Sequence, residues 1–330
     1  MESVVLFSSN NEEYIVNPHK DTELYRRNGN KLEFCRTMGK LINPHRVTFS
    51  KDDSKLLIQN NNALMELFDM ATFKKKKLKA PRNAGNVLFL NDDTLIFPTE
   101  LGKIYTMDIA TQELHLHFDY DNLTYANLFR LTDNKFIFAG YDNAKSESQI
   151  YILECNLEEI TIRLIGRPTS EISTDGMAFY KDNVYFVNCD NQLLAFNCNS
   201  INTSVTDNVC FDFNTHDVPN KLNRHQDYLF QLFPILKEHL TGELMFKNVC
   251  QYNNYIIVAF SGGIAILDAD NYSLLQTVPV YRGIDNILIT HTDGQIWFSD
   301  GFSVYVGSFD DLLKGELKVN VDCVSHYMTY

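Results

Sequence analysis

The stretch HRVTFSKDDSKLLIQNN, residues 45–61, contains the pattern that decides the fold. It reads as a short apolar strand, a polar turn at Asp52 and Asp53, and a second apolar strand. Asn, Asp and Gly tolerate left-handed backbone angles, so pairs of these residues suit the tight turn of a β-hairpin. If the same hairpin recurs at a fixed spacing, it is one unit of a repeat architecture.

The hairpin does recur. Aligned on the polar turn, the further copies read FSSNNEEYIV, FLNDDTLIF, RLTDNKFIF, FYKDNVYFV, CQYNNYIIV and THTDGQIWF. The second turn residues of the seven copies are Asn11, Asp53, Asp93, Asn134, Asn183, Asn254 and Gly294. Successive turns lie 42, 40, 41, 49, 71 and 40 residues apart. A period of about 40–45 residues is typical of β-propeller blades. The interval of 71 residues indicates one period plus an insertion.

In most units further apolar runs follow the hairpin. The third run ends in a polar break and reads MELFDMAT, IYTMDIAT, IYILECN, LLAFNCN or IAILDAD, and a more variable fourth run follows. We therefore predict an all-β, seven-bladed β-propeller of four-stranded antiparallel blades, with residues 1–330 forming a single domain. In the preferred register the first blade runs from Val4 to about Cys35 and the last from about Ile287 to Val321. No strand is obviously shared between the chain ends, although residues 322–330 could supply one.

The turn units, with LFDMAT and YTMDIAT closing third strands, resemble the WD-repeat and YVTN-type propeller families. The chain departs from the WD pattern because it has no WD dipeptide and no GH pair, and its one tryptophan, Trp297, falls in a second strand. The resemblance implies the fold. It also implies that binding occurs on the loop face, where fourth strands connect to the next first strands. It does not imply one activity, since propellers carry many.

Composition narrows the functional classes. The chain has 45% hydrophobic and 22% charged residues and a formal charge of −13, as expected of a soluble globular protein. This charge disfavours general binding to nucleic acid, which needs a basic surface. No apolar run approaches the ~18 residues of a membrane span. The opening residues lack a secretory signal, and the seven cysteines form no CxxC motif. We expect a reduced, cytoplasmic protein that is a monomer by itself.

The insertion lies between blades five and six, at about residues 213–243. Its second half places apolar residues at helical spacing, at Leu229, Leu232, Phe233, Leu236 and Leu240. We expect a partly helical segment that covers a blade edge, plugs the channel, contacts a partner or acts as a lid. Its candidate partner-binding residues are Tyr228, Phe230 and Phe233.

Four arginines lie just before predicted first strands: Arg46, Arg82, Arg167 and Arg282. First strands surround the central channel of a propeller, so these side chains could form a cationic ring at its mouth. The planar guanidinium suits a carboxylate or phosphate group. In the alternative, each arginine pairs with a nearby carboxylate and orders its loop. The candidate carboxylates are Glu100, Asp175, Asp190, Asp285 and Asp300.

Three other groupings are candidate sites. Some lactonase-type propellers hold a divalent cation with Glu, Asn and Asp, so Glu100, Asn83, Asp190 and Asp300 are an alternative site for a metal such as Ca²⁺. His115 and His117 alternate on one strand, but no third ligand is identifiable, and surface histidines explain them. The run Lys74–Lys77 falls on an outer strand, where charge resists edge pairing. It could also form a small patch for an acidic partner.

These observations favour a non-enzymatic protein–protein interaction module or scaffold without a cofactor. It would bind protein partners on the loop face that carries the insertion and the arginines. The chain has no GxSxG, Walker, zinc-hydrolase or dinucleotide motif. The alternative is a hydrolase or lactonase acting on a small anionic substrate, with a divalent metal at the channel mouth. A further alternative, a neutraliser of a basic toxin, rests on the negative charge alone.

Overall fold

The computed structural model describes most of the chain. The described residues are 5–8, 13–17, 22–28, 31–39, 44–60, 64–79, 81, 83–99, 101–120, 122–156, 159–200, 204–218, 244, 246–280, 284, 286–289, 294–299, 304–316 and 320–322. No helix in these ranges is long and apolar enough to cross a membrane.

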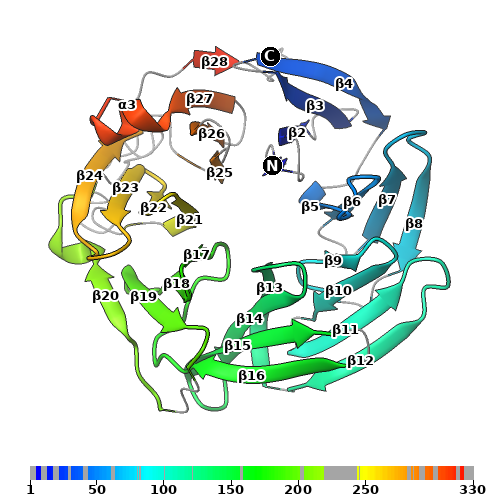
Figure 1. The fold of residues 1–330 in the computed structure, drawn as a ribbon, viewed down its shortest axis with the longest axis horizontal. Coiled ribbons are helices and arrows are strands. Elements are labelled where there is room, and N and C mark those ends of the chain that lie inside the picture. The colour runs from blue at the N-terminus through cyan, green and yellow to red at the C-terminus, as the bar shows by residue number, and fades with distance from the viewer. Residues whose placement is uncertain are drawn as a thin grey trace, which may run out of the picture. The chain divides into compact units, whose positions relative to one another are not determined.

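Within the described ranges the strands form seven four-stranded antiparallel sheets, each made of four consecutive strands (Figure 1). Blade one contains β1 (Val5–Ser8), β2 (Glu13–Asn17), β3 (Thr22–Asn28) and β4 (Lys31–Gly39). Blade two contains β5 (Pro44–Phe49), β6 (Lys55–Asn60), β7 (Leu64–Asp69) and β8 (Lys75–Lys79). Blade three contains β9 (Leu88–Asn91), β10 (Thr94–Pro98), β11 (Lys103–Asp108) and β12 (Leu114–Asp119). Blade four contains β13 (Leu123–Arg130), β14 (Lys135–Asp142), β15 (Glu147–Cys155) and β16 (Ile160–Gly166).

The later blades follow the same order. Blade five contains β17 (Ala178–Tyr180), β18 (Asn183–Val187), β19 (Gln192–Asn197) and β20 (Val209–Asp212), followed by the short 3-10 helix η1 (Phe213–Thr215). Blade six contains β21 (Phe246–Tyr252), β22 (Tyr255–Phe260), β23 (Gly263–Asp268) and β24 (Leu274–Pro279). Blade seven contains β25 (Asn286–Ile289), β26 (Gln295–Ser299), β27 (Val304–Ser308), the helix α3 (Phe309–Leu313) and β28 (Asn320–Asp322). The predicted class, an all-β fold of seven four-stranded blades, is confirmed.

The turn chemistry of the opening stretch explains its hairpin. Asp53 adopts the left-handed region at φ +57°, and the flanking strands pair Val47 with Ile58. The Asp52 carboxylate accepts hydrogen bonds from the Ser54 backbone N–H at 2.9 Å and the Ser50 hydroxyl at 2.7 Å. These local bonds fix the turn and therefore the register of the two strands.

The third strands end in a second local motif. In LFDMAT, Asp69 Oδ1 accepts hydrogen bonds from the Thr72 backbone N–H at 2.7 Å and the Thr72 hydroxyl at 2.8 Å. In YTMDIAT, Asp108 Oδ1 accepts the same two bonds from Thr111 at 2.7 and 2.9 Å. The resemblance noted in the sequence therefore has a physical basis, since the aspartate closes the turn to the fourth strand.

The core lies between blade faces. Central strands are buried on both faces, as in β10, where Leu95, Ile96 and Phe97 are all inaccessible to solvent. One apolar cluster joins blades two and three and includes Leu57, Met65, Leu78, Phe89 and Phe97. This packing explains the nearly continuous apolar second strands in the sequence, because both of their faces meet neighbouring blades.

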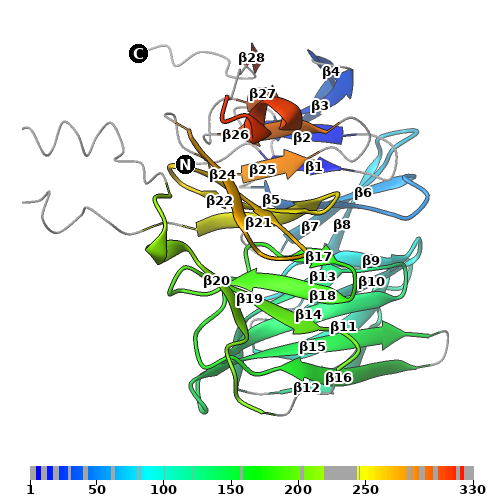
Figure 2. The ribbon, with the colours of Figure 1, turned by 60° about the vertical axis from the view of Figure 1, so that its left-hand side comes forward.

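The chain divides into two compact units. The first comprises Met1–Thr174, Asp182–Val184 and Phe196–Asn208, and the second comprises Asp175–Lys181, Tyr185–Ala195 and Val209–Tyr330. The first unit holds blades one to four and the second holds blades six and seven, while the strands of blade five are divided between them. Figure 2 shows the four strands of blade four, β13 to β16, side by side within the first unit. The expectation of a single domain stays a prediction.

The start of the insertion belongs to the core of the second unit. Phe213 is fully buried, and its ring contacts the rings of Phe211 and Phe260 at centroid distances of 4.9 and 5.1 Å. The helix predicted around residues 229–240 lies outside the described residues. Helix α3, between β27 and β28, is an element that the strand pattern does not predict.

Candidate functional site

The predicted binding residues have different outcomes. Arg82 and Arg282 lie outside the described residues, as do Tyr228, Phe230 and Phe233 of the insertion. The predicted position of Arg46 just before a first strand is wrong. β5 already begins at Pro44, and Arg46 is half-buried within this strand, opposite Gln59. The register shifts between Pro44 and Arg46, which is why the strand starts earlier than the apolar pattern indicates.

Arg167 lies where the sequence places it, directly after β16 and in the connection to blade five. Its guanidinium binds the Glu147 carboxylate through two bonds, from Nε to Oε1 at 2.9 Å and from Nη2 to Oε2 at 2.8 Å. Only 5% of the Glu147 side chain is exposed, against 25% of Arg167. Such a two-bond pair is strong and directional. Arg167 therefore follows the alternative in which the arginine orders its loop, with a carboxylate that the sequence analysis did not single out.

The pair belongs to a larger structure, the blade-four loop cluster, defined as residues 122–127, 142–149 and 167–174. Because neighbouring strands are antiparallel, the start of β13, the β14–β15 turn and the connection after β16 lie at the same end of the blade. The register confirms this, since Leu123 of β13 pairs with Asp142 at the end of β14. This end of the blade belongs to the loop face that the sequence analysis favours for binding.

Asp142 is the centre of the cluster and is fully buried. Its carboxylate accepts hydrogen bonds from the Tyr120 hydroxyl at 2.7 Å and the Ala144 backbone N–H at 3.0 Å, and Lys145 Nζ lies 3.4 Å away. Burial alone would raise the pKa of Asp142. The bonds from Tyr120 and Lys145 outweigh burial and hold the pKa below its usual value.

Gln149 separates the two buried carboxylates. Its Nε2 donates to Glu147 Oε1 at 2.9 Å and to Asp142 Oδ2 at 3.2 Å, and the Tyr151 hydroxyl donates to its Oε1. Burial, together with the charges around it, raises the pKa of Tyr151. One neutral amide thus donates to both carboxylates, and their hydrogen-bonding capacity is largely used inside the network. This arrangement stiffens the loops and offers no exposed acid–base pair.

The connection after Arg167 is fixed equally well. Asp207 accepts hydrogen bonds from the Thr169 backbone N–H and hydroxyl, both at 2.7 Å. Asn127 Nδ2 donates to the Thr174 carbonyl at 2.7 Å, and the Thr174 hydroxyl donates to the Tyr125 carbonyl at 3.0 Å. The bonds of Thr174 tie the connection to the first strand of the blade, and they bring together segments almost fifty residues apart in the chain.

Tyr125 is the exposed aromatic side chain of this cluster. It is 68% exposed and has φ +52°, in the left-handed region that a bulky residue rarely adopts. The register of β13 and β14 shifts between Thr124 and Asn127, so the strand bulges at Tyr125 and turns the ring outward. Backbone strain held by its surroundings often marks a functional position. Residues 126–128 are all buried after Tyr125, so the alternation of the strand breaks at the bulge, and the residue types of this stretch do not signal the break.

The alternative metal site is only partly described. Glu100 and Asp300 lie outside the described residues. Asn83 is exposed at φ +63°, and Asp190 is exposed and accepts a hydrogen bond from Asn214 through its backbone carbonyl. Among the described residues, no group of three His, Cys, Asp or Glu side chains is placed to hold a metal ion. His117 Nε2 lies 2.8 Å from the Thr106 hydroxyl, and burial, followed by the nearby His115, lowers the pKa of His117.

Comparison with known proteins identifies the fold. No protein-family model matches the chain. A search of curated proteins also finds no match. Among solved structures, 1300 chains match. One, described as "Structure of U3-55K", has a TM-score of 0.58 and 10% sequence identity, and the match covers 93% of this chain and 91% of that chain. Another, "Crystal structure of RRP9 WD40 repeats", has a TM-score of 0.58 and 9% identity, covering 93% of this chain and 90% of the other.

The chain is therefore a seven-bladed β-propeller similar to WD40-repeat structures, and the resemblance read from the turn units is confirmed. At such low identity the likeness concerns the fold alone, and a fold this widespread carries many activities.

Proposed function

We propose that this protein is a non-enzymatic protein-binding module and that the blade-four loop cluster is a contact surface for a partner protein. The observation that carries the proposal is Tyr125, a largely exposed aromatic ring on a strained backbone. Tyrosine is enriched among the residues that dominate binding at protein interfaces. It offers a large contact area with few rotatable bonds.

The surroundings of Tyr125 support binding without rearrangement. Its carbonyl is held by Thr174, and the neighbouring loop is held by the Asp142 and Glu147 networks. A surface that is rigid before association loses little conformational freedom when a partner binds. WD40-type propellers in general bind partner proteins through loops that are held on a rigid frame of blades. This general role supports the partner-binding role proposed for the blade-four loop cluster.

A second apolar side chain lies close to the cluster. Leu101 is 50% exposed and immediately precedes Gly102 in the β10–β11 turn. A Cβ atom on Gly102 would lie 2.8 Å from Leu123 Cβ, so this turn packs directly against the start of blade four. Leu101 would extend the contact area beyond Tyr125.

Site-specific photocrosslinking tests this proposal. A photoreactive phenylalanine analogue replaces Tyr125 in one sample and Leu275 in a control, because Leu275 is also exposed, at 44%, but lies on outer strand β24. Both proteins are irradiated in a lysate of the source organism. We expect a discrete protein adduct at position 125 that is absent at position 275. Identical adducts at both positions, or none at position 125, would contradict the proposal.

A further inference from the structure

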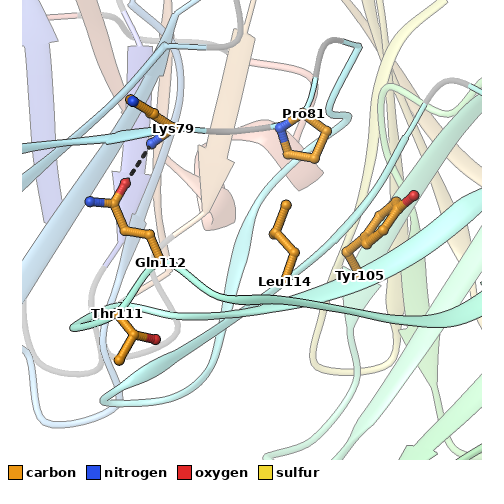
Figure 3. A pocket seen from close by; sticks show the side chains of 6 residues that line it. All are labelled: Lys79, Pro81, Tyr105, Thr111, Gln112 and Leu114. Atoms are coloured by element: carbon orange, nitrogen blue, oxygen red, sulfur yellow. Dashed lines mark hydrogen bonds between the residues drawn. The ribbon is translucent and has the colours of Figure 1, made fainter.

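An open hollow of about 550 Å³ lies in the first unit, between the end of β8 in blade two and strands β11 and β12 of blade three (Figure 3). Its lining residues are Lys79, Pro81, Tyr105, Thr111, Gln112 and Leu114. Figure 3 shows Leu114 pointing toward Pro81, with Tyr105 beside it. The apolar part of the lining can hold one bulky side chain. Of the described residues that line the hollow, Lys79 carries a charge at neutral pH and none is a carboxylate.

The hollow is a built feature rather than a gap between loose strands. The Lys79 backbone N–H donates a hydrogen bond to Gln112 Oε1 at 3.0 Å and so links the two blades (Figure 3). Gln112 occupies the left-handed region at φ +61°, which the preceding turn enforces. Leu114 remains 40% exposed and its neighbour on the same strand face, Leu116, 50% exposed. Apolar surface is therefore left open beside a fixed rim.

Strand β8, which ends at the hollow, is the outermost strand of its sheet and strongly basic. Residues 74–79 contain five lysines. Lys75 Nζ lies 3.1 Å from Glu66, and Lys76 Nζ donates to the Ile109 carbonyl at 2.7 Å. Among the described residues, no carboxylate pairs with the ammonium groups of Lys77 and Lys79. The charges of Lys74 and Lys76 also act on Asp69 and Asp108, so the surplus positive charge of residues 74–79 lies on Lys77 and Lys79.

The part of the chain that includes β8 also carries a net positive charge. Residues 22–79 contain thirteen Lys and Arg against six Asp and Glu, in a chain whose net charge is −13. Another hollow of about 570 Å³, beside β3 and β4, is lined by both Arg26 and Arg36 and both Glu33 and Asp53, so it has no preference for one charge. Among the described residues the β8 hollow is lined by a cation without a carboxylate, so, unlike the hollow beside β3 and β4, it has a clear electrostatic preference.

We propose that this hollow and the adjoining face of β8 bind an extended acidic segment of a partner protein. One aromatic or large aliphatic side chain of the segment enters the hollow against Pro81, Tyr105 and Leu114. Flanking carboxylates of the segment lie against Lys77 and Lys79. This surface is separate from the blade-four loop cluster, and the proposal does not rest on the function proposed there.

The test is a selection from a random peptide display library against the full-length protein. Soluble Lys77→Glu/Lys79→Glu protein serves as competitor and removes peptides that bind elsewhere. Both lysines are exposed, and the backbone bond to Gln112 persists in any residue at position 79. The matched control is Lys181→Glu/Lys314→Glu, which makes the same charge change at lysines that are 63% and 68% exposed. Enriched peptides are then synthesised, and their affinities are measured by fluorescence anisotropy.

We expect peptides with Asp or Glu on both sides of a single bulky apolar residue. Their affinity falls by about tenfold or more in Lys77→Glu/Lys79→Glu and in Leu114→Ser, and it is unchanged in the control and in Tyr125→Ala. The proposal is overturned if no acidic peptide discriminates the competitor, if the control weakens binding equally, or if a peptide binds equally well with its apolar residue changed to Ala. It is also overturned if a single-stranded oligonucleotide binds β8 more tightly than the best peptide, which would assign the surface to nucleic acid.

Discussion

Arg167 illustrates how one residue organises the candidate site. Replacing it with Met leaves the nearly buried Glu147 carboxylate without two charge-assisted hydrogen bonds. We expect Arg167→Met to lower the free energy of unfolding by about 2–4 kcal/mol. The double variant Glu147→Gln/Arg167→Met removes both charges and should recover part of the loss. Urea unfolding curves for both single variants and the double variant measure the coupling. A coupling free energy near zero would mean that the pair does not stabilise the loops.

Asp142 makes stability depend on acid pH. Its pKa is lower in the folded protein than in the unfolded chain, where it is about 3.9. The stabilisation is therefore present above that value and is lost as the pH falls through the folded pKa. We expect Asp142→Asn to be less stable than wild type at neutral pH by about 1–3 kcal/mol and to lose less further stability below pH ~4. Urea midpoints measured from neutral to acid pH test this, and parallel pH profiles for the two proteins would exclude it.

Some of these residues could be predicted from the sequence and others could not. The position of Arg167 follows from the repeat register. Its partner Glu147 could not be predicted, because it is reached across the β14–β15 turn, whose conformation depends on the buried Asp142 network. The prominence of Tyr125 depends on a bulge in β13, which no residue of the stretch LTYANLFR requires.

Substitutions at two glycines, Gly39 and Gly102, can distinguish the cost of backbone strain from the cost of a packing clash. Gly39 at the end of β4 and Gly102 in the β10–β11 turn have φ +80° and +77°. An alanine Cβ at Gly39 meets no described atom within 4 Å, whereas at Gly102 it would lie 2.2 Å from the Tyr120 carbonyl oxygen. We expect Gly39→Ala to lower the free energy of unfolding by about 1 kcal/mol. Gly102→Ala should lower it by about 2 kcal/mol or more beyond that, because of the added clash. Equal urea midpoints for the two variants would show that the turn adjusts to the added methyl group.

The elements themselves were predictable where local chemistry closes them. The aspartates in LFDMAT and YTMDIAT bond the threonine three residues on, so these strand ends can be read directly. The start of β5 was misplaced because Pro44 pairs across a register shift that apolar spacing does not reveal. Helix α3 was missed although its signal was present. Ser308 caps it by accepting a hydrogen bond from the Asp310 N–H, and Asp310 and Asp311 lie in its first turn.

At the scale of the whole molecule, the repeat period predicted the number of blades because each blade must bury two faces and so repeats the same apolar runs. Net charge was a weaker guide. The value of −13 suggested basic partners, yet residues 22–79 carry an excess of seven positive charges. The net charge of the whole chain hides this positively charged segment. The kind of partner that the segment would bind is indicated by the placement of Lys77 and Lys79 beside an open hollow.

The most direct test of the central claim is the affinity of the partner captured at position 125 for the wild-type protein and for Tyr125→Ala, measured with purified components. Tyr125 is 68% exposed, so its truncation should leave the fold intact, and an unchanged urea midpoint provides the control. We predict that Tyr125→Ala weakens binding by about thirtyfold, equivalent to ~2 kcal/mol, while Leu275→Ala leaves it unchanged. Equal affinity of Tyr125→Ala and wild type would contradict the assignment of the blade-four loop cluster as the binding surface.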